Sequence, residues 1–444
     1  YATTTDRPAD VRVNGVVVVD DLAFDATGAW ATWAVASTSA DLAAGVNLIR
    51  LEATTADGLP NIDSLTVDGM GISAGDCGGD GDTDTDTDTD TDTDTDTDTD
   101  TDTDTDTDTD TDTDTDTDTD TDTDVDVGVI RITDTVPGWA SVPVSGLPSG
   151  TTGGGTNLAG AITVSNMTAL QNAAEADGAA IILVQPGTYT GSLEPAANKT
   201  IIGTAPGVVI AGRIRLSGED VFNVIIRNLA VRGNTCSSYD ECRAGDDAVA
   251  VENKAHHVWL DHIDIADGQD GNCDFSKEAD YITTSFSRFR YTYNKEHRFS
   301  NLISSSDDST ADADNLRITY MNCWWGERVN QRQPRGRFGD VHLFNNFHNS
   351  GDDGQIVHGP GVQISMIIEN CYYEVPSGTE AIKIYDASAT IRATGNAGTA
   401  TDMNMTVGSV FTIPYDYTLL PAASVKAAVT ASVGGAGNTC TFAN

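Results

Sequence analysis

Short apolar runs rich in Val and Ile recur through the second half of the chain, and polar turn residues separate them. Such runs are typical of buried strands. Three spacings agree, because Val258 to Tyr281, Ile318 to Val341 and Val341 to Ile364 each span 23 residues. A period of about 20 residues with one strand per period predicts a solenoid of stacked coils. The main runs are residues 200–202, 208–210, 223–229, 258–265, 281–286, 316–320, 341–344 and 364–368.

No hairpin signal such as Asn-Gly lies between these runs, so we expect the coils to stack in parallel. The predicted fold is therefore all-β, a parallel β-helix. Residues 166–176 predict one early helix with an Asn or Thr cap, which would plug an open end of the stack. The Ala-rich run 422–431 predicts a short helix over the outer strands. We further expect one set of asparagines to face inward and to hydrogen-bond to their equivalents one coil away: Asn228, Asn322, Asn346 and Asn370.

The first part of the chain has a different organisation. Residues 1–76 carry short strand runs with turns between them, which predict a β-sandwich. Residues 77–126 are a linker, because strict Thr-Asp alternation has no apolar face and carries a charge at every second residue. We expect it to be extended and disordered, as a spacer, with calcium binding or glycosylation as alternatives. Residues 127–444 carry the chemistry.

The chain is strongly acidic, with a formal net charge of −44, of which 22 charges come from the aspartates of the Thr-Asp repeat. Its overall field excludes binding to nucleic acid or anionic membranes. No apolar run is long enough to span a membrane. The chain begins at Tyr1 without Met or a signal peptide, so we expect a fragment or a processed form. Cys236 and Cys242 bracket a short loop, where they form either a disulfide or two buried thiols.

Cations are concentrated in one region of this acidic chain. Ten of the 24 Lys and Arg residues lie between Lys277 and Arg337, and three arginines lie within residues 332–337. This layout favours a site for a carboxylate or phosphate, with a solvated basic loop as the alternative.

A set of aspartates lies upstream of the arginines. Asp247 precedes Asp270 and Asp274 by about one coil, so the three side chains are expected to stack on one face. Carboxylates without His or Cys partners form an oxygen-only site that suits Ca²⁺. The alternative is that loop aspartates only cap turns, as Asp270 before Gly271 would do well.

Together these motifs resemble pectate lyases of polysaccharide lyase family one over roughly residues 130–400. The resemblance implies a right-handed parallel β-helix as the fold. Residues 42–67 resemble the C-terminal part of β-sandwich carbohydrate-binding modules, so the first unit would be a truncated module. The motifs that carry the lyase resemblance are residues 223–229, 247–249, 258–262, 270–274, 280–285, Lys295, 332–339 and 341–346.

The resemblance implies calcium-dependent β-elimination on polygalacturonate. Asp247, Asp270 and Asp274 match the calcium ligands, and calcium would bridge the protein to a substrate carboxylate. Arg332 matches the general base. Because arginine is a poor base at neutral pH, neighbouring cations would have to favour its neutral form, and an alkaline optimum would follow.

Further basic residues match the carboxylate-binding positions of the family, namely Lys295 and Arg337. Arg335 is a further candidate for substrate binding, with a structural role or an acidic partner as the alternative. The chain departs from the family pattern at Gly245, where an acidic residue is common, and around Lys295, where His297 is unusual. We interpret the family marker at residues 261–262 as structural support.

Three alternatives stay open at this point. Asp246-Asp247 and His358-Gly359 superficially resemble polygalacturonases, which hydrolyse with paired carboxylates. Pectin lyases dispense with calcium, and the retained aspartates argue against that class. A non-catalytic polysaccharide-binding protein on the same scaffold is the third alternative. The expected enzyme is secreted, extracellular and monomeric.

Overall fold

The computed structural model describes residues 1–13, 16–29, 32–40, 49–55, 59–62, 128–350 and 356–443. The chain divides into an N-terminal and a C-terminal unit, and each is described by itself. The predicted linker, residues 77–126, and part of the segment that resembles a carbohydrate-binding module, residues 42–67, lie outside the described residues. The boundaries of the predicted domains therefore stay predictions.

The N-terminal unit contains a three-stranded antiparallel sheet in the order β2-β1-β3. In the central strand, residues alternate between buried and partly exposed, and Val11 and Val13 are among the buried ones. This alternation is what a sheet with one covered face requires. Within residues 1–62, the described strands form one sheet, and no second sheet of a sandwich is among them. The strands are β1 (Ala9–Val13), β2 (Val16–Leu22) and β3 (Ile49–Ala53).

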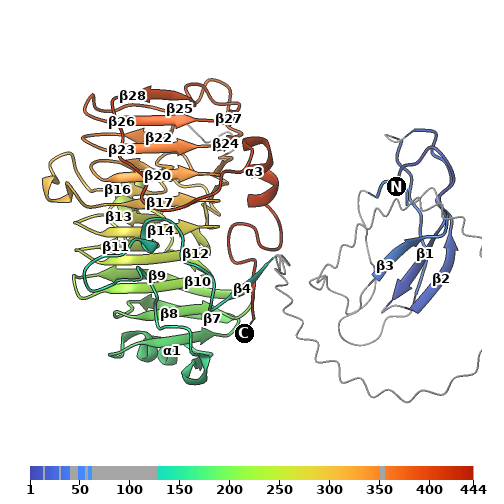
Figure 1. Cartoon of the computed structure of the whole chain (residues 1–444), viewed down its shortest axis with the longest axis horizontal. Helices are drawn as coiled ribbons and strands as arrows, with labels where there is room; N and C mark the ends of the chain where they lie inside the picture. Colours follow the sequence, from blue (N-terminus) through green and yellow to red (C-terminus); the bar gives the residue numbers. More distant parts are fainter. Residues whose placement is uncertain are drawn as a thin grey trace, which may run out of the picture. The chain divides into compact units, whose positions relative to one another are not determined.

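The C-terminal unit is a parallel β-helix, as the sequence predicts (Figure 1). Its coils stack into three sheets. The sheet that we call the site sheet consists of β7 (Gly187–Leu193), β9 (Val208–Ser217), β11 (Val249–Glu252), β13 (Cys273–Phe275), β16 (Leu302–Ile303), β19 (Arg335–Gly336), β22 (Ile356–Pro360) and β25 (Glu380–Ile382).

The second sheet, which we call the covered sheet, lies under segments from both ends of this unit. Its strands are β5 (Ile162–Val164), β6 (Ala180–Val184), β8 (Lys199–Gly203), β10 (Phe222–Arg232), β12 (His256–Ala266), β14 (Asp280–Ser285), β17 (Ile318–Met321), β20 (Asp340–Phe344), β23 (Ser365–Glu369) and β26 (Thr390–Thr394). The third sheet continues from the second halves of β10 and β12 through β15 (Arg288–Arg290), β18 (Trp324–Trp325), β21 (Phe347–His348), β24 (Tyr372–Tyr373) and β27 (Ala397–Gly398).

The apolar runs form continuous columns inside the coil. Equivalent positions on successive strands of the covered sheet are aliphatic and fully buried, so each coil packs on the next. Full burial of one such side chain contributes about 1.5–3 kcal/mol. One column consists of Val224, Val258, Ile282, Ile318, Val341, Met366 and Ile391.

The 23-residue spacing corresponds to strand pairing at one place and differs from it at two. Ile318 pairs with Val341, 23 residues on. Val258 pairs with Ile282, and Val341 pairs with Met366, which lie one and two residues beyond that spacing. The turns between the sheets differ in length, so a fixed period cannot follow them.

The prediction for the asparagines is wrong in detail. Asn322 and Asn370 adopt positive φ angles of 52° and 50° at the corner after their strands, and Asn228 has a φ of 56° inside β10; Asn tolerates this conformation. Asn346 points inward, but it accepts a hydrogen bond from the Cys323 N–H at 2.8 Å instead of bonding to another asparagine. Asn370 donates to the Leu420 carbonyl at 2.7 Å, and so holds the C-terminal segment.

Both predicted helices are present. α1 (Met167–Glu175) is capped by Asn166, which accepts from the Ala169 N–H at 2.9 Å, and it packs against the first strands at one end of the stack (Figure 1). α3 (Ala422–Val429) packs with Val425 and Val429 against Phe347 of the third sheet. No helix among the described residues is long and apolar enough to cross a membrane.

Short elements complete the unit. One pairing departs from the parallel pattern, because β28 (Met405–Val407) is antiparallel to β26 at the last coil. The ends of the unit meet where β29 (Thr441–Ala443) pairs with β4 (Val129–Arg131). The other short helices are α2 (Tyr239–Arg243), η1 (Gly138–Ser141), η2 (Leu158–Gly160) and η3 (Thr310–Asp312).

Candidate active site

The site sheet brings two of the three predicted calcium ligands together. Asp274 lies on β13, beside Ala250 of β11, and Asp247 lies just before β11. Gly271 packs against both carboxylates: a Cβ atom at this position would be 2.6 Å from Asp274 Oδ1 and 2.9 Å from Asp247 Oδ1. The two acids therefore converge over a glycine that leaves room for them.

These carboxylates are buried, and nearby Arg332 offsets only part of the cost of their charge. Burial and the neighbouring Asp270 raise the pKa of Asp247 to about 7, and Asp247 Oδ1 has no hydrogen-bond partner. Burial and Asp247 raise the pKa of Asp274 well above its usual value, although its Oδ1 accepts from the Leu302 N–H at 2.8 Å. Buried anions of this kind are costly unless a cation binds them.

The donor set fits a hard cation. Carboxylate oxygens are the ligands that Ca²⁺ prefers, and the unpartnered Asp247 oxygen is the kind of atom that such an ion satisfies. Within the described ranges, no three acidic, His or Cys side chains lie close enough together to hold a metal ion. The third predicted ligand, Asp270, places Oδ1 at 3.4 Å from His297 Nε2. It would have to turn toward Asp247 and Asp274 to complete the set.

Lys295 is tied to the loop that carries Asp270. Its ammonium group donates to the carbonyls of Gly268 and Gln269, the latter at 2.8 Å, and lies 4.7 Å from the centre of the Tyr291 ring. Burial lowers the pKa of Lys295 to about 8. The structure thus places Lys295 beside the acidic cluster, where it holds the backbone of that loop.

Of the three arginines, Arg335 lies on a strand of the site sheet, and Arg332 and Arg337 flank that strand. Arg335 on β19 is in register with Leu302 on β16, whose N–H bonds to Asp274, so Arg335 and Asp274 lie two strands apart, or about 10 Å. The guanidinium carbon of Arg332 lies 4.9 Å from the centre of the Phe299 ring on the preceding coil. Arg337 is ion-paired with the exposed Asp307.

His297 is a site residue whose position the sequence did not reveal. Its ring is 1 % exposed, stacks on Tyr239 at 5.2 Å and meets Phe299 edge-on at 4.4 Å. Burial and the nearby Arg332 lower the pKa of His297 to about 4, and neither ring nitrogen has a hydrogen-bond partner. A neutral imidazole therefore lies between the acids and the arginines.

The predicted disulfide alternative is confirmed. Cys236 and Cys242 are bonded, with their Cα atoms 5.2 Å apart, and they close the loop that contains α2. That loop brings Tyr239 onto His297. The short spacing of the two cysteines was the signal that marked it. The other described cysteines are free and buried: Cys273, Cys323, Cys371 and Cys440.

The family marker at residues 261–262 lies on the covered sheet. Asp261 accepts hydrogen bonds from Arg227 Nε at 2.8 Å and Ser285 Oγ at 2.6 Å, and lies 2.8 Å from His262 Nδ1. Burial opposes the charge on Asp261, but His262 and Arg227 hold the pKa of this carboxyl below its usual value. This fully partnered network agrees with a structural role.

The arrangement expected of a polygalacturonase is not assembled. Asp246 is ion-paired with Arg213 at the surface. His358 is fully buried inside the coil and lies 2.9 Å from the Tyr373 hydroxyl. It is therefore not available on the outer face of the site sheet.

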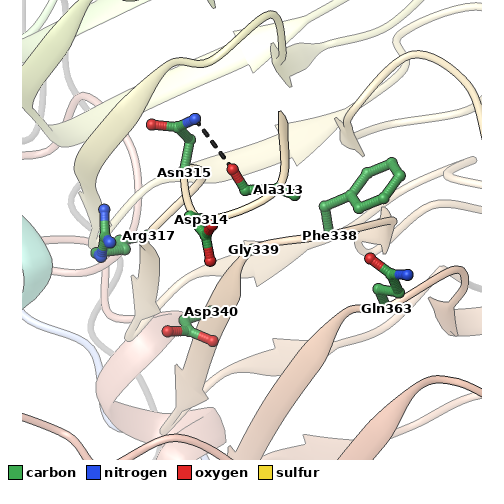
Figure 2. A pocket seen from close by; sticks show the side chains of 8 residues that line it. All are labelled: Ala313, Asp314, Asn315, Arg317, Phe338, Gly339, Asp340 and Gln363. Carbon is green, nitrogen blue, oxygen red and sulfur yellow. Dashed lines mark hydrogen bonds between the residues drawn. The ribbon is translucent and has the colours of Figure 1, made fainter. Parts of the chain in front are cut away.

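A pocket of about 180 Å³ lies beside Phe338 and Gly339, just after the three arginines of residues 332–337 (Figure 2). Arg317 reaches into it and is ion-paired with Asp280. Neither the acidic cluster nor the three arginines line this pocket, so it is separate from the predicted site. The lining residues are Ala313, Asp314, Asn315, Arg317, Phe338, Gly339, Asp340 and Gln363.

The sequence is similar to those of known pectate lyases. Residues 133–439 match the sequence profile of the family described as pectate lyase. The chain is 34% identical over 228 residues to the pectate trisaccharide-lyase of Thermotoga maritima, a match that covers 50% of this chain and 59% of that relative. It is 31% identical over 322 residues to pectate lyase A of Aspergillus niger, which covers 70% of this chain and 90% of the relative.

Solved structures show the same fold. A mutant pectate lyase of Bacillus subtilis superposes with a TM-score of 0.55 at 22% identity, over 69% of this chain and 98% of that one. A pectate lyase bound to a hexasaccharide gives the same TM-score and identity, over 68% and 97%. With the sequence match over most of the β-helix unit, these findings establish that the chain belongs to the pectate lyase family.

Proposed function

We propose that this protein cleaves polygalacturonate by calcium-dependent β-elimination. The observation that carries the proposal is the outer face of the site sheet. It presents the converging carboxylates of Asp247 and Asp274, whose charge is only partly compensated, about two strands from Arg335. Carboxylates that can bind a metal cation, followed along the sheet by an arginine that can bind an anion, suit a polymer that carries one carboxylate per sugar.

Calcium is the cation that this donor set favours, and Asp247, Asp270 and Asp274 would hold it. When bound, it would bridge the acidic protein to a substrate carboxylate and make the adjacent C5 proton more acidic. Lys295 supports the set, because it fixes the carbonyls of residues 268 and 269 immediately before Asp270.

Arg332 would remove the C5 proton. The electron pair of that C–H bond then forms the C4–C5 double bond, and the O4 leaving group departs and is protonated. Phe299 lies under the guanidinium group and limits its freedom, so that the base is held at one position. Arg337 would stabilise the negative charge that develops on the substrate carboxylate. The product is a 4,5-unsaturated oligogalacturonate.

The proposal is tested by the ultraviolet absorbance of polygalacturonate with the protein, first with calcium and then with a chelator. The conjugated double bond should absorb, and the chelator should abolish the increase. An increase in reducing ends without absorbance would mean hydrolysis and would overturn the proposal. Binding without either signal would leave a non-catalytic polysaccharide-binding protein.

We also propose that the enzyme is secreted. The Cys236–Cys242 disulfide supports this location, because disulfides persist mainly in oxidising compartments. Fractionation of a culture of the source cells would test it, with activity expected in the medium.

A further inference from the structure

A second cation–aromatic cluster lies further along the site sheet, and the chemistry proposed above makes no use of it. The guanidinium carbon of Arg335 lies 4.1 Å from the centre of the Tyr385 ring. The Lys383 ammonium group lies 5.9 Å from the same ring. Tyr385 is 40% exposed, so the cluster opens to solvent.

Gly359 makes this cluster possible. It lies on β22, in register with Arg335 on β19. A Cβ atom at Gly359 would lie 3.0 Å from Arg335 Cγ and 3.1 Å from Tyr385 Cε2. Both side chains therefore pack directly on the glycine, where a side chain would crowd them. The Tyr385 N–H donates to the Pro360 carbonyl at 2.8 Å, and this bond holds the backbone from which the Tyr385 side chain extends.

Arg335 differs from Arg288, another arginine that stacks on an aromatic ring. Arg288 lies 4.0 Å over Trp324 on the third sheet, but it is also ion-paired with Glu327. Within residues 128–350 and 356–443, Arg335 forms no ion pair with a carboxylate. A guanidinium group that lies flat on a ring keeps the N–H groups along its edge free for a carboxylate.

The side chains of Arg332 and Arg335 extend in opposite directions along the stack of coils. Arg332 lies over Phe299, which precedes it by one coil. Arg335 lies over Tyr385, which follows β25, two strands further on. Arg335 is thus directed away from the acidic cluster, toward the later coils of the stack.

We infer that Arg335, positioned by Tyr385 over Gly359, binds the carboxylate of a uronate residue beyond the bond that is cleaved. The inference rests on the proposed function and names a subsite that gives the enzyme a preference for longer acidic chains. Lys383 adds a positive charge at the rim, partly offset by Glu380 at 4.0 Å. Tyr385 acts as a positioning residue, because it holds the guanidinium group.

The test is equilibrium binding of hexagalacturonate and trigalacturonate, with calcium, by titration calorimetry. The wild type should bind the hexamer more tightly. Arg335→Gln should weaken hexamer binding about tenfold or more, the effect of losing a charged hydrogen bond, and should affect the trimer less. Tyr385→Ala should show the same selective loss, and Tyr385→Phe, which keeps the ring, should restore the hexamer preference.

Two further variants make the test specific. Arg288→Gln is the matched control, because it removes a stacked arginine from a different sheet, and it should leave the hexamer preference unchanged. Gly359→Ala adds one methyl group between Arg335 and Tyr385, and it should lower hexamer affinity without removing either partner.

The outcomes separate this inference from the proposed function. Equal affinity of the wild type for both oligomers, or an equal loss for both in Arg335→Gln, would overturn the inference. A selective loss of hexamer affinity in a protein that produces no unsaturated product would support the subsite and overturn the lyase activity.

Discussion

Two sheets of the β-helix each bury carboxylates, but they treat them in opposite ways. On the covered sheet, Asp261 is 2% exposed, and Arg227, His262 and Ser285 all bind it. On the site sheet, Asp274 is 9% exposed and has only one N–H donor, from Leu302. Both carboxylates are therefore buried, but Asp261 has three side-chain partners and Asp274 has a single backbone donor among the described residues.

The pKa values follow the partners. His262 and Arg227 outweigh burial and lower the pKa of Asp261, whereas burial and Asp247 raise that of Asp274. A buried acid with a complete set of partners stabilises the fold. A buried acid without them, on an open face, is suited to bind a ligand. The predictions below test this distinction.

The largest effect is expected on the site sheet, in turnover. Arg332→Lys should lower the rate of elimination by roughly 10³-fold, within the range for loss of a general base. Hexagalacturonate binding and the melting temperature should change little, because Arg332 contacts Phe299 and forms no part of the core. Absorbance assays and thermal unfolding of the same preparation measure both. A variant that keeps its activity would remove Arg332 from the mechanism.

The covered sheet should respond in stability instead. Asp261→Asn leaves the buried Arg227 and His262 without their shared anion, and it should lower the free energy of unfolding by about 3 kcal/mol. Denaturant unfolding measures the change. The folded fraction should retain its activity per molecule. A fall in activity beyond the loss of folded protein would place Asp261 in the chemistry and break the comparison.

The ion pair of Asp261 and His262 should make the free energy of unfolding depend on pH. Burial disfavours the charged imidazole, but Asp261 overcomes this and raises the pKa of His262 to about 10. The stabilisation is therefore fully present below about pH 6.5, the ordinary value for His, and is lost as the pH rises toward 10. The lowered pKa of Asp261 contributes stability above about pH 4 that is lost in acid. The stability difference between wild type and Asp261→Asn should thus be greater at pH 6 than at pH 9, and a constant difference would contradict the coupling.

The smallest effect is expected from neutralising one acid of the site sheet. Asp247→Asn removes a buried charge that repels Asp270 and Asp274, so in chelator it should stabilise the protein by about 1 kcal/mol. Calcium should raise the melting temperature of the wild type and not that of the variant. Differential scanning calorimetry with and without calcium measures both shifts. Destabilisation in chelator would show that Asp247 is structural, like Asp261.

Much of this protein was determined by its sequence. The recurring Val and Ile runs required stacked coils, because only successive coils can cover one another's apolar face. Asn166 and the residues after it required one capped helix. The three aspartates were predicted to share a face because a solenoid stacks residues one coil apart, and the structure brings Asp247 and Asp274 together there.

Other features were decided only by the tertiary structure. Turns of unequal length moved the partners of Val258 and Val341 by one and two residues from the regular spacing. Lys295 is held by the carbonyls of residues 268 and 269, and Arg335 meets Tyr385 only because Gly359 has no side chain. Each of these contacts joins residues from different coils, far apart in the chain. Local pattern therefore determines the kind of coil, whereas the partners of each polar side chain depend on how the coils stack.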